Sequence, residues 1–372
     1  MKCTLADVAD ITMGQSPKSE YYNSKGDGIP FLQGNRTFGR RYPIFDTYTT
    51  FTTKIAKAGD VIMSVRAPVG DLNIAPVDMC LGRGVCGIKM KNGNNDFLFY
   101  LLKYYMPQLI NKETGTVFGS VNKNGINGLE IDIPKEETVQ KKIARYLSLI
   151  DDKIEENEKI NKNLEQQAQA LFNQVFPYTL EDKLPHNWVI GTVNDVIELH
   201  DSKRIPLSGF QRSKMKKRIY PYYGAASLMD YVDEYIFDGT YLLLGEDGTV
   251  VDNQGYPILQ YIWGQFWVNN HAHILTGKRG FNVESLYLLF KCTPVKSIIT
   301  GAVQPKISQA NLKSLKIVIP PENAISEFNF TIKPIFSLIR SNQDENKSLS
   351  ELKDNLLSKL MSGEIDISNL DI

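Results

Sequence analysis

The side chains best suited to chemistry in this chain fall into a small acidic and histidine group and a larger basic and amide group. His271 and His273 alternate along an extended stretch, so both side chains would lie on one face of a strand. No acidic or cysteine partner stands at metal-ligand spacing from them, so we expect a structural or DNA-facing role rather than metal binding. Asp151 and Asp152 lie in a polar helix-forming stretch and are expected to be solvated surface.

Motifs of enzymes are absent from the sequence. It contains no Gly-rich phosphate loop, no HExxH and no GxSxG. It also lacks the Asn/Asp-Pro-Pro-aromatic sequence with which amino-methyltransferases grip a flipped base. We therefore expect no catalytic residues, no metal and no cofactor in this chain.

Basic side chains gather in the second half of the sequence. Between Lys203 and Arg218 the chain carries Lys203, Arg204, Arg212, Lys214, Lys216, Lys217 and Arg218. Pro206 and Gly209 make part of this segment a loop, which can follow a phosphate backbone. The alternative is ordinary solvated surface charge.

A second basic and amide group lies in the first half, in a glycine-bounded loop. Arg, Gln and Asn are the side chains suited to bidentate contacts with guanine and adenine edges. This loop supplies Gln33, Asn35, Arg36, Arg40 and Arg41, and further DNA-binding candidates are Lys18, Arg66, Lys278 and Arg279.

These candidates lie in two related halves, because the sequence contains an internal duplication. Residues 114–134 and 300–320 share a Thr-Gly-x-Val start and an aliphatic run that ends in proline, at a constant offset of 186 residues. Each copy leads into a long polar helix-forming stretch. A period of this length indicates two tandem domains, because solenoid repeats recur every 20–50 residues.

The globular halves are strand-rich. Short apolar runs such as 60–65 and 241–244 are bounded by glycines and turn signals, as buried strands are, and short helices are expected near 97–106 and 283–290. We predict an α+β fold with domains at 1–135 and 177–321 that alternate with helices at 136–176 and 322–372. The two helices would form an antiparallel coiled coil, in a chain with an internal pseudo-two-fold repeat.

A heptad pattern marks the helix–helix seam. The predicted seam residues are Ile143, Leu147, Ile150, Ile154, Asn157, Asn161, Leu164, Leu171, Leu349, Leu352, Leu356 and Leu360. Asn157 and Asn161 would fix the register at some cost in stability. Pro334 is expected to confine the regular second helix to the residues that follow it. The alternative is that each helix packs on its own globular domain.

Charge is distributed unevenly although the 372-residue chain has a formal net charge of zero. Residues 1–135 and 177–321 have net charges of +4 and +2, and the two helical stretches −2 and −4. The two basic modules suit a nucleic-acid partner, and the two acidic helices suit a protein partner. The four cysteines form no CxxC pair, and no apolar run approaches membrane-spanning length. We expect a cytoplasmic protein with no membrane contact.

In order and spacing, these features resemble the specificity (S) subunit of type I restriction–modification systems. The duplicated signature and two long helices carry the resemblance, with local agreement at 13–17, 28–31, 203–207, 222–225 and 269–273. The resemblance implies two target-recognition domains, each reading one half of a split double-stranded DNA site. It also implies methyltransferase (M) subunits that carry the S-adenosylmethionine chemistry, and an ATP-dependent restriction (R) subunit as a further partner.

The function expected is therefore a non-catalytic DNA-recognition subunit that directs partner subunits to a bipartite, asymmetric site. Two alternatives belong to other classes. One is a stand-alone enzyme acting on DNA, which the missing cofactor and metal motifs disfavour. The other is a coiled-coil scaffold or adhesin whose duplicated modules bind protein or sugar.

Overall fold

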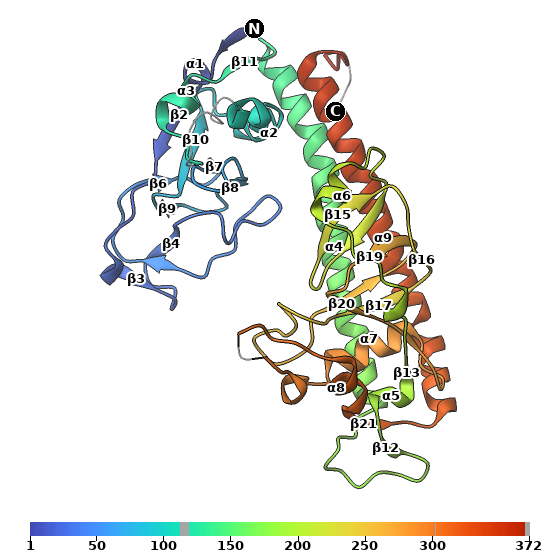
Figure 1. Ribbon diagram of the computed structural model, residues 1–372. Helices are drawn as coiled ribbons and strands as arrows, with labels where there is room; N and C mark the ends of the chain where they lie inside the picture. Colours follow the sequence, from blue (N-terminus) through green and yellow to red (C-terminus); the bar gives the residue numbers. More distant parts are fainter. Residues whose placement is uncertain (112–118, 302, 369–372) are drawn as a thin grey trace. The chain divides into compact units, whose positions relative to one another are not determined.

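A computed structural model describes residues 1–111, 119–301 and 303–368 (Figure 1). The chain forms two compact units. Unit 1 comprises Met1–Asn157 and Asp344–Ile372, and unit 2 comprises Glu158–Gln343. The division falls within the two long helices, so each unit contains part of both. None of the helices in the described ranges carries an apolar stretch long enough to cross a lipid bilayer.

Unit 1 is strand-rich, as predicted. Its elements are β1 (Lys2–Thr4), α1 (Leu5–Val8), β2 (Ala9–Met13), η1 (Ser19–Tyr21), β3 (Tyr22–Asn23), β4 (Ile29–Leu32), β5 (Tyr48–Thr49), β6 (Ile55–Ala56), β7 (Val61–Ser64), β8 (Leu72–Ile74), β9 (Met79–Leu81), β10 (Val85–Met90), α2 (Asn95–Asn111), α3 (Lys123–Asn127) and β11 (Glu130–Asp132). The strands form sheets in the orders β2-β10-β7-β8, β3-β5-β4-β9-β6 and β1-β11.

Unit 2 has a similar order, with one more α-helix, one more 3-10 helix and one strand fewer among the described residues. Its elements are β12 (Val189–Thr192), α5 (Val193–Val196), β13 (Ile197–Leu199), η2 (Asp201–Lys203), α6 (Gly209–Ser213), β14 (Tyr220–Tyr223), β15 (Leu228–Val232), β16 (Phe237–Asp238), β17 (Tyr241–Gly245), β18 (Leu259–Ile262), β19 (Gln265–Val268), β20 (Ala272–Gly277), α7 (Val283–Lys291), η3 (Lys296–Ile298), α8 (Gln309–Ser314) and β21 (Lys316–Ile319). Its sheets run β13-β20-β17-β18, β15-β14-β19-β16 and β12-β21.

The same local devices start both units. Thr4 and Thr192 each close a capping box with the Asp three residues later, and each threonine amide donates to that carboxylate over 2.7 Å. One helix then packs against each central sheet. The run 97–102 of α2 is buried throughout, as are 285–290 of α7. Both helices confirm the short helices expected near 97–106 and 283–290.

The first long helix, α4, extends over Glu137–Val175, close to the predicted 136–176. The second, α9, is continuous over Glu322–Ser362 with Pro334 inside it, so the predicted interruption was wrong. Proline in a helix interior costs about 3 kcal/mol. Ile332 and Phe336 are buried on either side of Pro334, and burying each such side chain contributes about 1.5–3 kcal/mol.

The two helices pack against each other in both units, and residue numbers fall along one helix as they rise along the other. In unit 1, Asn157 Nδ2 donates to Asn346 Oδ1 over 2.8 Å. In unit 2, Asn342 Nδ2 donates to Asn161 Oδ1, also over 2.8 Å. The predicted asparagine positions in the seam are confirmed.

One seam prediction was wrong. Leu352 is 49% exposed, and its neighbour Lys353 takes the buried position. Lys353 Nζ lies 2.6 Å from Asp151 Oδ1, and the Tyr100 hydroxyl donates to Asp151 Oδ2 over 2.8 Å. Asp151 is therefore a buried seam residue, not the solvated surface carboxylate expected from the sequence. A buried carboxylate is retained here because both of its oxygens have partners.

The helices also enter the cores of the units, so the alternative of packing on a globular domain holds alongside helix–helix pairing. Ile143, Leu147 and Leu360 join the core beneath α2 in unit 1. Ala168, Phe172 and a row from α9 join the core of unit 2. The other predicted seam leucines and isoleucines, namely Ile150, Leu164, Leu171, Leu349 and Leu356, are partly buried, and Ile154 is fully buried.

Candidate nucleic-acid interface

Three turns meet in unit 1 at the ends of its central strands. The Gly82 amide donates to Leu32 O over 2.7 Å, and the Gly84 amide donates to Gln33 O over 3.0 Å. The Val65 amide donates in turn to Gly84 O over 2.9 Å. These backbone bonds join the turn after β4, the turn after β7 and the turn between β9 and β10 into one surface.

Glycine is required in the turn between β9 and β10. A Cβ on Gly84 would lie 2.3 Å from Gln33 O, and one on Gly82 would lie 2.8 Å from Gln33 Cα. Neither contact can be relieved without moving backbone. The side chain between them, Arg83, therefore projects from a backbone that close packing holds in place.

The three turns enclose a cavity of about 220 Å³. Its lining is Gln33, Gly34, Asn35, Arg66, Ala67, Arg83 and Gly84. Three residues predicted from the sequence, Gln33, Asn35 and Arg66, are thus brought together. Arg83 is a candidate that the sequence reasoning missed, although the Gly-Arg-Gly pattern at 82–84 was a readable turn signal.

A second hollow of about 350 Å³ adjoins the first and shares Gln33, Gly34 and Asn35 with it. Two side chains in its wall are tied to acidic neighbours. Asn35 Nδ2 donates to Asp71 over 2.5 Å, and Arg36 pairs with Asp46 at 2.6 Å across an exposed surface. The Arg36 guanidinium lowers the pKa of the Asp46 carboxyl, chiefly through this hydrogen bond.

Unit 2 forms the same junction from other side chains. The Asn269 amide donates to Tyr223 O over 3.0 Å, the Glu246 amide donates to His271 O over 2.8 Å, and the Ile307 amide donates to Glu246 O over 2.8 Å. These bonds match those of Gly82, Val65 and Val121 in unit 1. The strand registers agree, since Val85 pairs with Ser64 as Ala272 pairs with Gly245.

This match makes residue positions in the two units equivalent. Isolated bridges join Arg66 to Ser120 and Asp247 to Lys306, so position 66 corresponds to 247 and position 120 to 306. By the strand register, Arg83 corresponds to Asn270 and Gly84 to His271. The backbone geometry is shared, whereas the side chains differ at every one of these positions.

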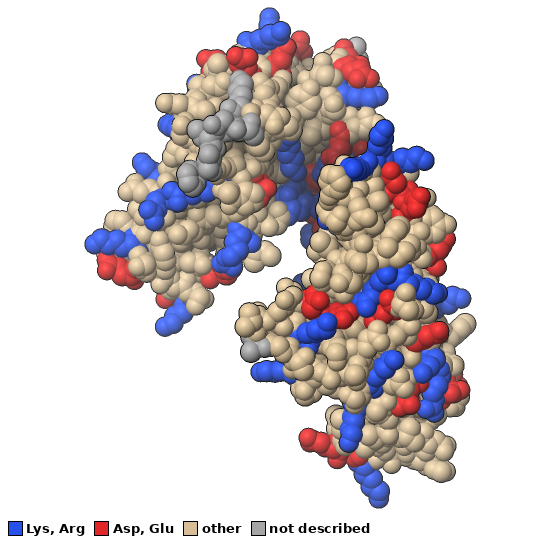
Figure 2. All heavy atoms as spheres, viewed as in Figure 1, with Lys and Arg blue, Asp and Glu red and all other residues tan. Residues whose placement is uncertain are grey.

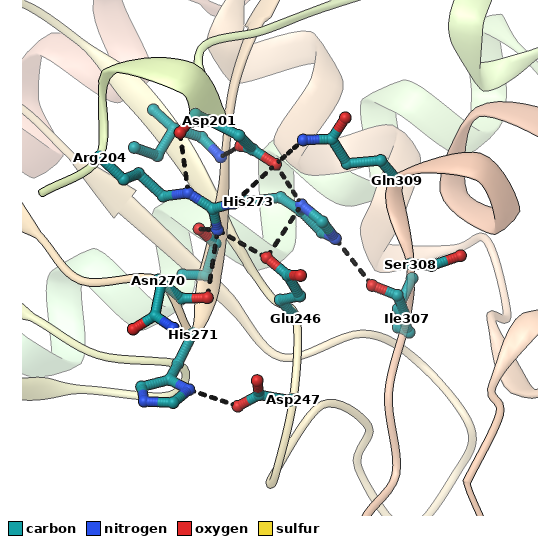
Figure 3. Close-up of polar contacts among 12 residues, drawn as sticks. Asp201, Arg204, Glu246, Asp247, Asn270, His271, His273, Ile307, Ser308 and Gln309 are labelled. Atoms are coloured by element: carbon teal, nitrogen blue, oxygen red, sulfur yellow. Dashed lines mark hydrogen bonds and ion pairs between the residues drawn. The ribbon is translucent and has the colours of Figure 1, made fainter. Parts of the chain in front are cut away.

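A buried polar network supports the junction in unit 2 (Figure 3). The Asp201 carboxylate accepts hydrogen bonds from the Ile274 amide over 2.9 Å and from Gln309 Nε2 over 2.6 Å, and its Oδ2 lies 2.6 Å from His273 Nδ1. Burial opposes ionisation of Asp201, but the bond from His273 and the other donors outweigh it, so the pKa of Asp201 is lowered.

His273 faces an acceptor at each ring nitrogen. Nδ1 lies against Asp201, and Nε2 lies 2.8 Å from Ile307 O, within a fully buried side chain. The histidine thus joins β20 to the loop that carries Lys306. This arrangement confirms a structural role for His273. Unit 1 has Met13, Val65 and Cys86 at the positions of Asp201, Glu246 and His273, so the network is particular to unit 2.

Metal binding is the other chemistry this cluster could offer. Ligand atoms of Asp201, Glu246 and His273 lie within 4.8 Å of one another, so acidic partners that the sequence spacing did not reveal are present. Protein cations already compensate the carboxylates. Arg204 Nη1 lies 2.6 Å from Glu246, and Lys306 Nζ lies 3.3 Å from it. The cluster is therefore an internal ion-pair network.

Two predicted DNA-binding arginines are committed to the protein interior, and these predictions were wrong. The Arg41 side chain is 9% exposed and pairs with Asp152 at 2.5 Å and Glu155 at 2.6 Å. Arg204 is held by Glu246 and by the carbonyl oxygens of Asn270 and Ala272. Arg41 ties its loop to helix α4, Arg204 holds the backbone of a turn, and neither presents a free surface to DNA.

The basic segment 203–218 is only partly available to a ligand. Arg212 pairs with Asp230 at 3.0 Å, and Arg218 pairs with the same carboxylate. Asp233 accepts hydrogen bonds from three consecutive backbone amides at 216–218, which fixes the loop. The exposed cations of the segment are Lys203, Lys214, Lys216, Lys217 and the paired Arg218, and Lys214 lies 4.0 Å from the Phe210 ring centroid.

The remaining predicted cations lie on the surface. Lys18, Arg40, Lys278 and Arg279 are exposed; Lys18 lies 3.8 Å from Glu20, and Arg279 lies 3.7 Å from Glu322. Figure 2 shows Lys and Arg spread over the viewed face of both units and interspersed with Asp and Glu. Basic side chains are thus spread over this face rather than gathered in one patch, and the junctions of turns give the surface its local shape.

The geometry is that of a duplicated protein, in which one scaffold appears twice and presents different side chains at the same backbone positions. The chain belongs to the family described as the type I restriction modification DNA specificity domain, whose model matches residues 1–166 and 185–351. The family assignment confirms the resemblance seen in the sequence.

Relatives and a solved structure agree with this assignment. A Methanocaldococcus jannaschii protein named as the MjaX type I restriction enzyme specificity subunit is 42% identical over 165 residues, which are 44% of this chain and 39% of that protein. The MjaIX specificity subunit of the same organism is 24% identical over 98% of this chain and 93% of its own length. The S subunit from M. genitalium shares the fold, with a TM-score of 0.58 at 16% identity over 99% of this chain and 96% of its own.

Proposed function

We propose that this chain is the sequence-reading subunit of a type I restriction–modification complex and recognises a DNA site made of two different blocks. One observation carries the proposal. Both units build the same junction of turns, and the side chains at equivalent positions differ, as between Arg66 and Asp247 or Arg83 and Asn270. Two recognition units with the same backbone arrangement and different contact residues suit an asymmetric DNA site.

The helices would act as the spacer between the readers, as an antiparallel coiled coil. Asparagine pairs lie in the seam in each unit, and a buried asparagine fixes register. Helices of 39 and 41 residues extend about 60 Å. A pair of this length exceeds the roughly 34 Å that separates half-sites one turn apart on B-DNA. An unread gap between the two blocks follows.

Catalysis would belong to other chains. The family contributes DNA specificity and is non-catalytic. Partner methyltransferase subunits would bind S-adenosylmethionine, extrude the target base and methylate it, and an ATP-dependent restriction subunit would join a complex that also cuts. Asp152 and Glu155 on the acidic helix α4 are held by Arg41, so such a partner would contact other helix positions.

Binding selection tests the proposal. The purified chain is incubated with a pool of randomised duplexes, and bound sequences are read at 50 and 200 mM salt. The expected result is a motif of two different blocks at constant separation, with total binding that falls steeply as salt rises. Binding to a glycan or protein array without sequence-selective DNA binding would favour the scaffold alternative. Methyl transfer by the pure chain would favour the enzyme.

A further inference from the structure

The cavity of unit 1 is lined by two arginines whose guanidinium groups have no polar partner among the described residues. Arg66 and Arg83 are both exposed and line the same cavity of about 220 Å³. In the part of the chain that the structure describes, neither guanidinium forms an ion pair or hydrogen bond. Most other predicted arginines are paired, including Arg36, Arg41, Arg204, Arg212 and Arg218.

Each of the two arginines stands on backbone that is held in place. The Arg83 amide donates to Ser16 Oγ over 3.1 Å, between glycines that cannot accept a Cβ. Arg66 is bridged to Ser120, and the Val121 amide donates to Val65 O over 3.0 Å. Because the backbone that carries each arginine is already fixed, less entropy is lost when the side chain is ordered on a ligand. This favours specific contacts over loose electrostatic ones.

The shape of the site also favours base contacts. A concave surface with two planar five-donor groups at its wall can accept a base-pair edge, and arginine bound bidentately to guanine O6 and N7 is the commonest specific contact. A phosphate-binding surface needs only exposed cations, as the lysines of 203–218 provide in unit 2.

We propose that Arg66 and Arg83 read guanine in the DNA block recognised by unit 1, and that the equivalent positions of unit 2 read a block of different composition. This inference rests on the proposed function and names the bases that one of its sites recognises. In unit 2, Asn270 takes the place of Arg83, and an amide side chain suits adenine N6 and N7. Asp247 takes the place of Arg66 and lies 2.6 Å from His271 Nδ1, which leaves unit 2 without a guanidinium at either position.

The test compares DNA selections by the unmodified chain and five variants, three of which concern Arg83 and its control. Arg83→Gln removes the guanidinium, and Arg83→Lys keeps the charge but loses the planar fork. Lys89→Gln is the matched control, because Lys89 is an exposed cation on β10 of the same unit. Circular dichroism establishes that each variant is folded.

The expected result is a guanine in the first block of the wild-type motif. Its preference over the other bases should fall by about 5- to 150-fold in both Arg83 variants, with the second block unchanged and the control identical to wild type. Arg66→Gln should relax another position of the same block. The graft Asn270→Arg should add a guanine preference to the second block.

Other outcomes distinguish failure of the arginine assignment from failure of the proposed function. If the wild-type motif has two blocks but the first contains no guanine, or if Arg83→Gln weakens all sequences alike, the assignment of the arginines is overturned while the proposed function stands. If the wild-type protein selects no sequence, the proposed function itself fails.

Discussion

The buried ion pair between α4 and α9 gives a sharp prediction about the helix seam. Lys353→Met removes the cation that lies 2.6 Å from Asp151, and both side chains are at most 10% exposed. Among the described residues, Asp151 then keeps only the Tyr100 hydroxyl as a partner. Breaking a buried pair by removing one partner costs about 3–5 kcal/mol, because an uncompensated charge remains. Unit 1 should lose that much stability.

Hydrogen exchange read by mass spectrometry measures this loss. Amides of α4 near Asp151 should exchange faster by about two to three and a half orders of magnitude, since 1.4 kcal/mol is tenfold. Leu352→Ala is the matched control, because Leu352 is 49% exposed and such surface changes stay within about 0.5 kcal/mol. The double change Asp151→Asn with Lys353→Met should recover most of the loss. Equal exchange in Lys353→Met and Leu352→Ala would refute the seam assignment.

Three further predictions concern unit 2, the basic loop and the spacer. Because the pKa of Asp201 is lowered in the folded protein, its carboxylate stabilises unit 2 at pH values above the ordinary aspartate pKa of about 3.9, and this stabilisation is lost as the pH falls through the pKa of the folded state. Asp201→Asn should abolish this pH dependence of unfolding in acid titrations followed by Trp fluorescence, because all three tryptophans (Trp188, Trp263 and Trp267) lie in unit 2. Changing Lys214 or Lys216 to Ala should weaken binding of all sequences alike and reduce the salt slope by about one per phosphate contact, and loss of selectivity at a single base pair would mean a base contact instead. Inserting four residues after Asn161 in α4 and four before Asn342 in α9 keeps the helices paired and adds about 6 Å and 40°, so the gap in the methylated motif should grow by one or two base pairs, and an unchanged gap with full activity would mean that the helices are not the spacer.

The sequence predicted the elements whose signals are local. The heptad spacing of α4 and the asparagines of the seam follow from side-chain periodicity, so Asn157 and Asn161 were placed correctly. The first third of α9 was missed because Pro334 argues against a helix locally. Buried Ile332 and Phe336 supply a tertiary stabilisation that no local rule includes. Lys353 was missed because a charge at a core position is recognised only when its partner is known.

Partners far apart in the sequence explain the errors at the candidate site. Arg41 meets Asp152 and Glu155 more than a hundred residues along the chain, and Arg204 meets carbonyl groups of the turn at 270–272. An arginine in a glycine-bounded loop has the same appearance in sequence whether it is buried or free. Arg83 shows the converse, since its exposure results from two glycines that pack on the backbone of another strand.

The central claim, two independent readers of one asymmetric site, is tested most directly by mapping methylated bases across the genome of cells that carry this chain with its methyltransferase. The motif should contain two different blocks around a fixed gap. Arg83→Gln in unit 1 should alter only one block, and Asn270→Arg in unit 2 only the other. A single contiguous or palindromic motif, or a change in both blocks from one substitution, would contradict the account.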